Sequence, residues 1–394
     1  METVYMDHAA ATPVRSEAIE AMLPYFDREF ANPSTLYASG AKVQKDIEEQ
    51  REKVAGLIGA ETGEIVFTAS GAEANNMALK GVPLARRKKG SHVVISGIEH
   101  HSVLNSARFL QQMDFEVSYL PVDETGLVDP EKLERSIRPE TVLVSVMHGN
   151  NEIGTVQPID ELSAVCRSRG VLMHTDAVAT AGQIPVNVDE LNVDLLSLSA
   201  PSLRGSKGVG ALYIRGSTRV MPLIHGGIQE RGRRAGTENV PGIIGFGKAA
   251  ELAVQELEEN AAGLRTLRDR LKAGIQDRIG KIRFTGHPEK RLPGHLSLCF
   301  EAIEGEALVF LLSQQGICIN TGSACASKAL KTSPVLTAIS VKPEIAHGSA
   351  VFTLSPVNTQ EDVDYVIETL PQVVDKLRSY SPLWEEKAAA GSKV

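Results

Sequence analysis

The sequence predicts an α/β protein whose core is a mostly parallel sheet covered by helices. From Glu64 onward, short apolar runs alternate with amphipathic stretches of helical periodicity. These runs are apolar on both faces, which is typical of strands buried inside a parallel sheet. The seven runs are Ile65–Phe67, His92–Ile95, Val117–Leu120, Val142–Met147, Val171–Met173, Leu195–Leu198 and Ala211–Ile214.

The length of 394 residues predicts two domains. We expect a large domain over residues 15–255 that holds the seven strands. A long charged helical pattern, Ile243–Ile279, then leads into a smaller α/β domain formed by residues 1–14 and 256–384. Residues 385–394 are expected to be a disordered tail. The strands expected in the smaller domain are Leu296–Phe300, Ile317–Asn320 and Ala350–Leu354.

Composition and charge narrow the classes of partner. A net charge of −8 offers no broad basic surface, so we expect no nucleic acid partner. No apolar stretch is long enough to span a bilayer, and Met1–Arg15 lacks the pattern of a signal peptide. We therefore expect a cytoplasmic protein with no membrane partner. Four cysteines without a CxxC pair indicate reduced thiols, and Cys166 and Cys299 are predicted to be core residues.

Four loops at predicted strand ends carry polar groups. Thr68–Asn76 is a small-residue turn that can hold an anion on backbone amides, and Glu99–His101, His148–Glu152 and His174–Asp176 add imidazole, amide and carboxylate groups. Each group taken alone is explained as a helix cap or a loop hydrogen bond. Because ligands of such sheets bind where the strands end, we expect the four loops to meet at one site.

The chain also carries an ordered series of longer motifs. They are YMDHAAATP at Tyr5–Pro13, MHGNNEIG at Met147–Gly154, HTDA at His174–Ala177, GSKGVGALY at Gly205–Tyr213, GGIQERGRRAGTEN at Gly226–Asn239 and GSAC at Gly322–Cys325. In these motifs the chain resembles the NifS/IscS group of cysteine desulfurases, which are fold-type I pyridoxal phosphate (PLP) enzymes of the class-V aminotransferase group. The resemblance covers almost the whole chain and implies a homodimer.

The resemblance assigns roles to five retained positions. It implies that His100 stacks on the pyridine ring and that Asp176 pairs with the pyridine nitrogen. Asn151 and Ser199 are further cofactor positions, and Thr237 is offered to the phosphate across the dimer. An alternative is that Asp176 and His100 hydrogen-bond each other or water in a vacated pocket.

The covalent link to the cofactor is missing from the pattern. In the family a Ser-x-His-Lys segment carries the Schiff-base lysine, but here Ser202 stands in the lysine position and Pro201 in that of the histidine. A hydroxyl cannot form an imine. Lys207 is no substitute, because it matches a lysine that the family already has in its Gly-x-Lys-Gly turn. We therefore expect no covalently attached PLP.

Other family residues are also replaced. The phosphate turn has Ala72 in place of threonine, and Ala179 replaces a glutamine. Val351 occupies the position of the arginine that, in the family, holds a substrate carboxylate in bidentate fashion, so this anchor is lost. Pro356 stands where another arginine is usual. Tyr37 replaces the histidine of the Asn-Pro-Ser motif.

The loop Thr321–Ser327 keeps the family pattern and contains Cys325, which matches the catalytic cysteine. We interpret Cys325 as a functional thiol, either a ligand of an iron–sulfur cluster shared with a scaffold protein or a persulfide carrier. The alternative is an inert surface relic. The segment Ser379–Trp384 resembles the one with which IscS-type proteins meet an IscU/NifU-like scaffold.

The sequence thus favours a protein of iron–sulfur cluster assembly or sulfur transfer whose PLP-dependent chemistry is lost or crippled. The first alternative is a working desulfurase that converts L-cysteine to L-alanine and a persulfide with non-covalent PLP. The second is a structural relic that pairs with an active paralogue.

Overall fold

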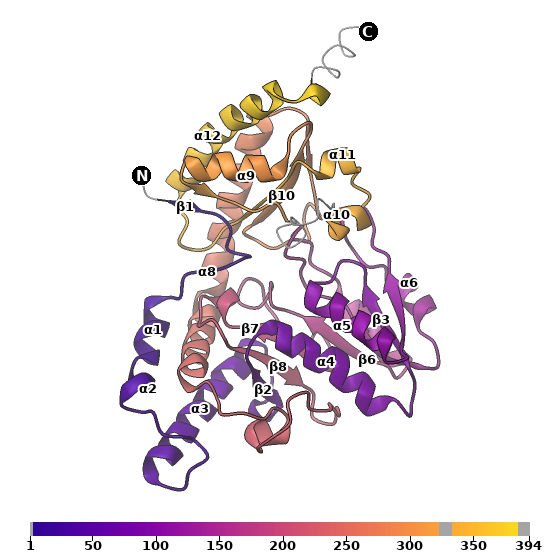
Figure 1. Cartoon of the computed structure of the whole chain (residues 1–394), viewed down its shortest axis with the longest axis vertical. Helices are drawn as coiled ribbons and strands as arrows, with labels where there is room; N and C mark the ends of the chain where they lie inside the picture. The colour runs from indigo at the N-terminus through magenta and orange to yellow at the C-terminus, as the bar shows by residue number, and fades with distance from the viewer. Residues whose placement is uncertain (1–2, 323–332, 385–394) are drawn as a thin grey trace.

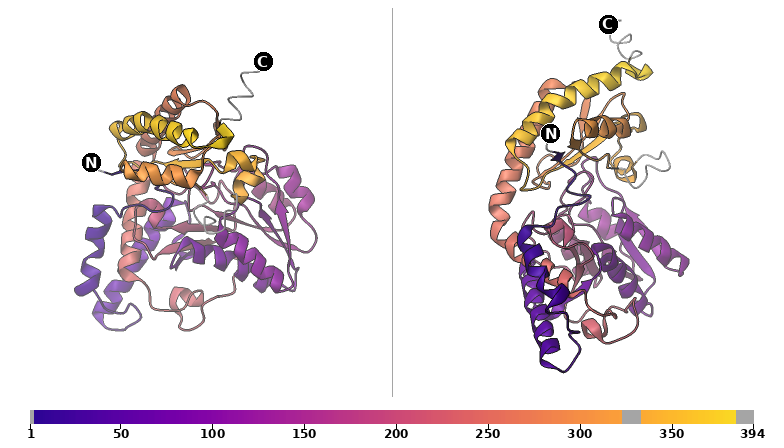
Figure 2. Two further views of the ribbon diagram at one scale, coloured as in Figure 1. Left: turned by 45° about the horizontal axis from the view of Figure 1, so that its top comes forward. Right: turned by 60° about the vertical axis from the view of Figure 1, so that its left-hand side comes forward.

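The computed structural model describes residues 3–322 and 333–384. A large sheet with its helices occupies the lower part of Figure 1, and a smaller sheet with its helices lies above it. The long helix α8 (Val240–Arg278) runs beside both parts, as the right-hand view of Figure 2 shows. Within the described ranges, no helix is long and apolar enough to cross a membrane.

The large sheet has seven strands in the order β2-β8-β7-β6-β5-β3-β4. Only β8 runs against the others, so the sheet is mostly parallel, as expected. The strands are β2 (Ile65–Thr68), β3 (His92–Ser96), β4 (Glu116–Leu120), β5 (Thr141–Ser145), β6 (Leu172–Asp176), β7 (Leu195–Ser199) and β8 (Gly210–Ile214).

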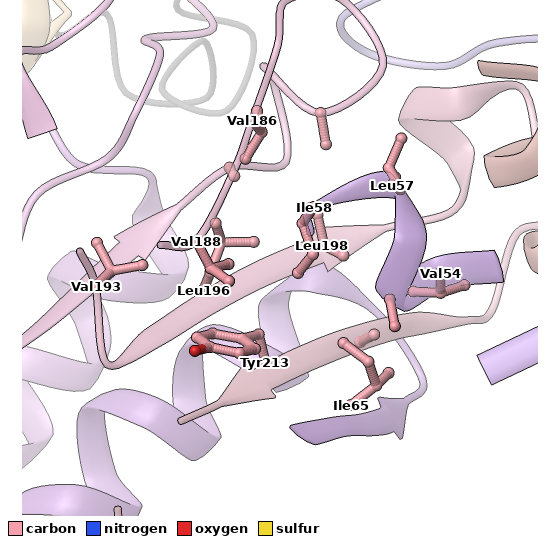
Figure 3. Close-up of a cluster of buried hydrophobic side chains, with 14 of the residues drawn as sticks. Val54, Leu57, Ile58, Ile65, Val186, Val188, Val193, Leu196, Leu198 and Tyr213 are labelled. Carbon is pink, nitrogen blue, oxygen red and sulfur yellow. The ribbon is translucent and has the colours of Figure 1, made fainter. Parts of the chain in front are cut away.

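Both faces of this sheet are covered by helices, which explains the continuous apolar runs. Successive side chains alternate between two cores, because they point to opposite faces of a strand. Val93 packs with α4 and α5, whereas Val94 packs against the face that α3, α7 and the first half of α8 cover. Figure 3 shows part of the second core, with Tyr213 beside Leu196 and Leu198. These helices are α3 (Ala38–Leu57), α4 (Gly71–Arg86), α5 (His101–Gln112) and α7 (Ile159–Ser168).

Helix α8 contributes to two cores along its length of 39 residues. Its first turn is capped by the Asn239 side chain, which accepts a hydrogen bond from Gly242 N at 3.2 Å. Residues 243–253 pack under the large sheet, whereas Leu264, Leu271 and Ile275 pack in the smaller part. The expected domain boundary at residue 255 falls inside this continuous helix, and the division into two domains stays a prediction.

The smaller part is built on an antiparallel sheet in the order β12-β10-β9. A separate parallel pair joins β1 to β11, with Val4 opposite Ile317. Strand β9 was not predicted, because only two apolar residues flank Arg283 in it. The elements are β1 (Val4–Tyr5), β9 (Ile282–Phe284), β10 (His295–Phe300), α9 (Gly305–Gln314), β11 (Ile317–Cys318), β12 (Ser349–Thr353) and α12 (Gln360–Ser379).

Short helices connect these parts. Three-residue and four-residue 3₁₀ turns precede β2, follow β7 and precede α8. The remaining elements are α1 (Ser16–Met22), α2 (Pro24–Asp27), η1 (Thr62–Glu64), α6 (Pro130–Ser136), η2 (Pro201–Leu203), η3 (Gln229–Gly232), α10 (Pro334–Ala338) and α11 (Pro343–Ala346).

Candidate active site

The carboxylate of Asp176 lies at the end of β6 and is 4% exposed. Asn75 Nδ2 donates to its Oδ2 at 2.6 Å, and Val178 N donates to its Oδ1 at 3.0 Å. Burial raises the pKa of Asp176, and these two hydrogen bonds oppose that shift. Asn75 comes from the second turn of α4, so the Thr68–Asn76 loop region and β6 meet here, as predicted.

His100 is tied to the same cluster, although not by a direct bond to Asp176. It caps α5, and its Nδ1 lies 2.7 Å from Ser102 Oγ. Asn75 Nδ2 donates to the same Ser102 oxygen at 2.9 Å and to Asp176. Within residues 3–322 and 333–384, no direct hydrogen bond joins Asp176 to His100. Asn75 and Ser102, which the sequence reasoning had not singled out, link them.

A second carboxyl group joins two of the strand-end loops. Glu99 accepts hydrogen bonds from Ser96 Oγ and, at 2.8 Å, from Met147 N. Its other oxygen is buried without a partner in the described part of the chain. Burial raises the pKa of Glu99 to about 8, so the carboxyl is protonated at neutral pH. Together with Asn150, whose Nδ2 donates to Ile98 O, it brings the 99–101 and 148–152 loops to the site of Asp176.

The first turn of α4 fits closely between the strands. A Cβ at Gly71 would lie 2.7 Å from Val178 Cγ2, and one at Gly210 would lie 2.6 Å from the Ser70 carbonyl carbon. The two glycines therefore let the start of the helix approach the sheet. The 16-residue helix presents its N-terminus toward this edge, and helix N-termini attract anions. Ala72 lies in this first turn.

A cavity of about 350 Å³ opens beside the strand ends. Asn151, Ser199 and Ser202 line it, together with groups from the smaller part of the molecule. Ser202 Oγ donates to Ser199 O at 2.7 Å. No lysine is among the described residues that line the cavity. Lys207 Nζ instead donates to Thr12 O at 3.2 Å, in keeping with its expected place in a turn.

The other replaced positions lie in different parts of the structure. Ala179 and Pro356 line the cavity, and Val351 is a buried residue of β12. Tyr37 is 58% exposed at the start of α3. Thr237 lines a separate pocket of about 130 Å³, so the single chain does not bring it to Asp176.

The cysteine predictions divide into two groups. Cys166 and Cys299 are 1% and 0% exposed and pack in hydrophobic cores, which confirms their predicted place. Burial raises the pKa of both thiols to about 12, so neither is a reactive thiolate. Cys325 lies outside the described residues. Among residues 3–322 and 333–384, no group of three or more His, Cys, Asp and Glu residues could hold a metal ion.

The sequence profile of the family "Aminotransferase class-V" matches residues 4–366. The chain belongs to this family. The match confirms the resemblance to class-V aminotransferases and, with the structural likeness below, the fold-type I architecture.

The class-V relatives include proteins named "Cysteine desulfurase IscS". One from Dictyoglomus turgidum is 49% identical over 383 residues, which cover 97% of each chain. Another from Methanosarcina thermophila is 51% identical over 382 residues, covering 97% of this chain and 94% of that protein. The chain is thus a NifS/IscS-like member of the class-V family.

Solved class-V structures have the same fold. A "NIFS-LIKE PROTEIN" superposes with a TM-score of 0.90 at 38% identity and covers 95% of this chain and all of that one. The apo structure of a cysteine desulfurase from Thermococcus onnurineus NA1 gives a TM-score of 0.85 at 25% identity, with 95% of each chain covered.

Proposed function

We propose that this class-V protein mobilises sulfur from cysteine for iron–sulfur cluster assembly or sulfur transfer, with PLP held non-covalently. One observation carries the proposal: the hydrogen-bonded Asp176 site persists in a chain about half identical to proteins named cysteine desulfurase. This was the first alternative from the sequence. The comparisons favour it over a protein whose PLP chemistry is lost.

The described residues fit the ring and the phosphate of PLP. Asp176 offers a buried carboxylate for the pyridine nitrogen, held in place by Asn75 and Val178. His100 is exposed beside it, where a ring can stack. The start of α4 offers backbone N–H groups to a phosphate, as predicted for the Thr68–Asn76 turn. When bound, PLP supplies an electron sink for carbanion chemistry.

The covalent link is the part that does not fit. Ser202 is engaged with Ser199 O and carries no amine. Non-covalent attachment therefore depends on the Asp176 cluster and the start of α4. With no lysine amine beside the reacting carbon, the transfer of a proton there must use another base, so turnover is expected to be slow.

Cys325 is proposed as the sulfur-accepting thiol or as the ligand of a shared cluster. A homodimer and an IscU/NifU-like scaffold complete the proposal. The Arg378 guanidinium lies 4.2 Å from the centre of the Trp384 ring, a cation–π contact that holds the end of the Ser379–Trp384 segment against α12. This contact supports a preformed surface for the scaffold.

The second candidate is a cytoplasmic assembly protein without desulfurase activity. The lack of a lysine among the described lining residues favours it. In this candidate Cys325 receives sulfur from another source, or completes a cluster on the scaffold.

PLP binding and sulfide release separate the two candidates. The purified protein is mixed with PLP, reduced with borohydride and mapped by peptide mass spectrometry, and sulfide release from L-cysteine is measured in parallel. We expect reversible PLP absorbance, no pyridoxyl-lysine peptide, and slow sulfide release. The variant Ser202→Lys should give a pyridoxyl adduct at position 202 and raise the rate at least tenfold.

The matched control is Ser202→Met, which has similar length but no amine and should do neither. A wild-type protein that neither binds PLP nor releases sulfide would overturn the first candidate and support the second. An adduct on Lys207 in the wild-type protein would overturn non-covalent attachment.

The role of Cys325 is tested on the complex with the scaffold. Cys325→Ser should abolish persulfide formation or shorten the lifetime of an anaerobically formed cluster, read by absorbance and Mössbauer spectroscopy. Cys166→Ser is the control, because its thiol is buried in a core and should affect stability alone. Equal persulfide yields and cluster lifetimes for Cys325→Ser and the wild type would show that Cys325 is neither the sulfur acceptor nor a cluster ligand.

A further inference from the structure

The cavity beside the strand ends holds one guanidinium without a partner. Among the described lining residues, the charged groups are Arg15, Arg204 and Glu256. Arg15 Nη2 lies 2.8 Å from Glu256 Oε1, so these two charges compensate each other. Arg204 has no ion pair within the described part of the chain, and its Nε is buried without a hydrogen-bond partner. Glu17 and Glu256 act on Arg204 electrostatically, but both form their ion pairs with Arg15. Arg204 is therefore the one charged group among these lining residues that forms no ion pair in the described part of the chain.

The backbone around Arg204 fixes its position firmly. It follows the η2 turn and adopts the left-handed conformation, with φ +60° and ψ +29°. This conformation is unfavourable for a residue with a Cβ. Arg204 N donates to Pro201 O at 3.0 Å, and Arg204 O accepts from Arg15 N at 2.9 Å. A strained, anchored position that presents a charged side chain to a cavity is typical of a functional site.

Two further polar groups of the same cavity lack partners. Ser355 is 5% exposed, and its Oγ has no hydrogen bond within residues 3–322 and 333–384. His8 is 8% exposed, and neither ring nitrogen has a partner at hydrogen-bond distance. Burial lowers the pKa of His8 to about 4, so at neutral pH its ring is uncharged and keeps one N–H donor. Buried donors of this kind are normally satisfied, and a bound anion would satisfy them.

The cavity also contains one of the two positions at which the resembled family has an arginine and this chain does not. Pro356, which stands where that family has an arginine, lines the cavity with Arg204 and Ser202. A guanidinium offers the same pair of N–H donors to a carboxylate wherever it stands in the cavity. An arginine at a different position can therefore bind a carboxylate in the same bidentate manner. The volume of about 350 Å³ is within the range of small-molecule sites.

We propose that Arg204 binds the carboxylate of a small α-amino acid in this cavity and so takes the role of the arginine that is absent at Val351. The inference rests on the proposed function, since it names the residue that recognises its amino-acid substrate. Ser355 and the His8 N–H are additional donors that line the cavity.

Calorimetric titration of the purified full-length chain with L-alanine, which is not turned over by a desulfurase, tests the proposal. Ethylamine is the matched probe, because it lacks only the carboxylate. We expect L-alanine to bind the wild-type protein more tightly than ethylamine. Arg204→Asn should weaken L-alanine binding by about tenfold to a hundredfold and leave ethylamine unaffected, since charge-assisted hydrogen bonds to the carboxylate are lost. Arg204→Lys should fall between the two.

The variants also separate binding from a structural role. Asparagine tolerates the left-handed conformation better than arginine does, so Arg204→Asn should keep or raise the melting temperature. The control is Arg233→Asn, which changes another arginine with a buried, unpartnered nitrogen that does not line the cavity. It should leave L-alanine binding unchanged.

Wild-type affinity for L-alanine in Arg204→Asn, or no L-alanine binding by the wild-type protein, would overturn the inference. A lowered melting temperature together with equal losses for L-alanine and ethylamine would also overturn it. Binding through Arg204 without sulfide release from L-cysteine would instead overturn the proposed function alone. Sulfide release with a KM unchanged by Arg204→Asn would overturn the inference alone.

Discussion

The two sides of the candidate active site differ in how their polar groups are satisfied. On the side of the strand ends, Asp176, Asn75 and Ser102 form a chain of hydrogen bonds that needs no ligand. On the side of the cavity, Arg204 and Ser355 carry buried polar atoms with no partner among the described residues. The polar groups of the first side are satisfied by hydrogen bonds within the chain. Those of the second side would be satisfied by a bound ligand.

This difference shows how retained residues should be interpreted. A hydrogen-bonded cluster such as that of Asp176 contributes to stability whether or not a cofactor binds, so its presence alone does not prove catalysis. An unpartnered guanidinium has an unfavourable free energy in the folded protein, so its presence points to a ligand. Substitutions on the two sides should therefore have different effects on stability.

The largest effect is expected on the side of the strand ends. Asn75→Ala removes the donor to Asp176 Oδ2 and leaves a buried carboxylate oxygen unsatisfied, which should lower the free energy of unfolding by about 2 kcal/mol. Chemical denaturation measures the change. The control is Asn76→Ala on the same helix. The Asn76 side chain donates a hydrogen bond to Ala72 O at an exposed position, so we expect the free energy of unfolding to change by less than about 0.5 kcal/mol. Equal effects of the two substitutions would mean that the Asp176 cluster does not stabilise the fold.

Glu99 should make stability depend on pH. Its pKa is about 8 in the folded protein and 4.5 in the unfolded chain, so the folded state binds more protons between these values. The stabilisation is complete below pH 4.5 and is lost as pH rises through 8, with a slope of at most about 1.4 kcal/mol per pH unit. Glu99→Gln, which stays neutral, should reduce the loss of stability between pH 6.5 and 8.

Glu152 supplies an internal comparison for that experiment. Burial raises its pKa to about 8 as well, so part of the slope should persist in Glu99→Gln and disappear in Glu99→Gln/Glu152→Gln. Urea denaturation at several pH values gives these slopes. A wild-type stability that rises from pH 6.5 to 8 would contradict the assignment of a neutral Glu99.

The smallest effect is expected at Ser355. Because its hydroxyl has no partner among the described residues, Ser355→Ala should change the free energy of unfolding by less than about 0.5 kcal/mol, or raise it slightly. Ser145→Ala is the matched buried substitution, and it should cost about 1 kcal/mol because it removes the hydrogen bond to His174 Nδ1. Thermal or urea denaturation compares them. A larger loss for Ser355→Ala than for Ser145→Ala would show that Ser355 has a structural partner.

The sequence predicted the large sheet well, because each of its seven strands contains or overlaps one of the short apolar runs. It also predicted that four polar loops meet at one edge, since parallel strands end there together. It could not predict which side chains touch. Asn75 faces the site because of its position in the second turn of α4. Ser102 lies there because His100, the N-cap of α5, accepts a hydrogen bond from Ser102 N.

Other features depended on tertiary structure. Strand β9 forms from three residues because β10 offers it a partner, although Arg283 weakens its apolar pattern. Nothing in the sequence indicates that Arg204 has a left-handed backbone, because glycine is the residue that usually marks this conformation and position 204 is not a glycine. A signal was present, since an arginine lies two residues after the Ser202 position at which the lysine is missing. Thr237 was assigned a role across a dimer, which a single chain cannot test.

The pairing of β1 with β11 has a consequence for synthesis on the ribosome. Tyr5 is made more than 300 residues before Cys318, which it faces in this pair. At translation rates of about 5–20 residues per second, the N-terminal strand waits on the order of 15 to 60 s for its neighbour. The two-stranded β1–β11 sheet therefore closes late, after the strands of the seven-stranded sheet have been made, and β1 has no neighbouring strand during that interval.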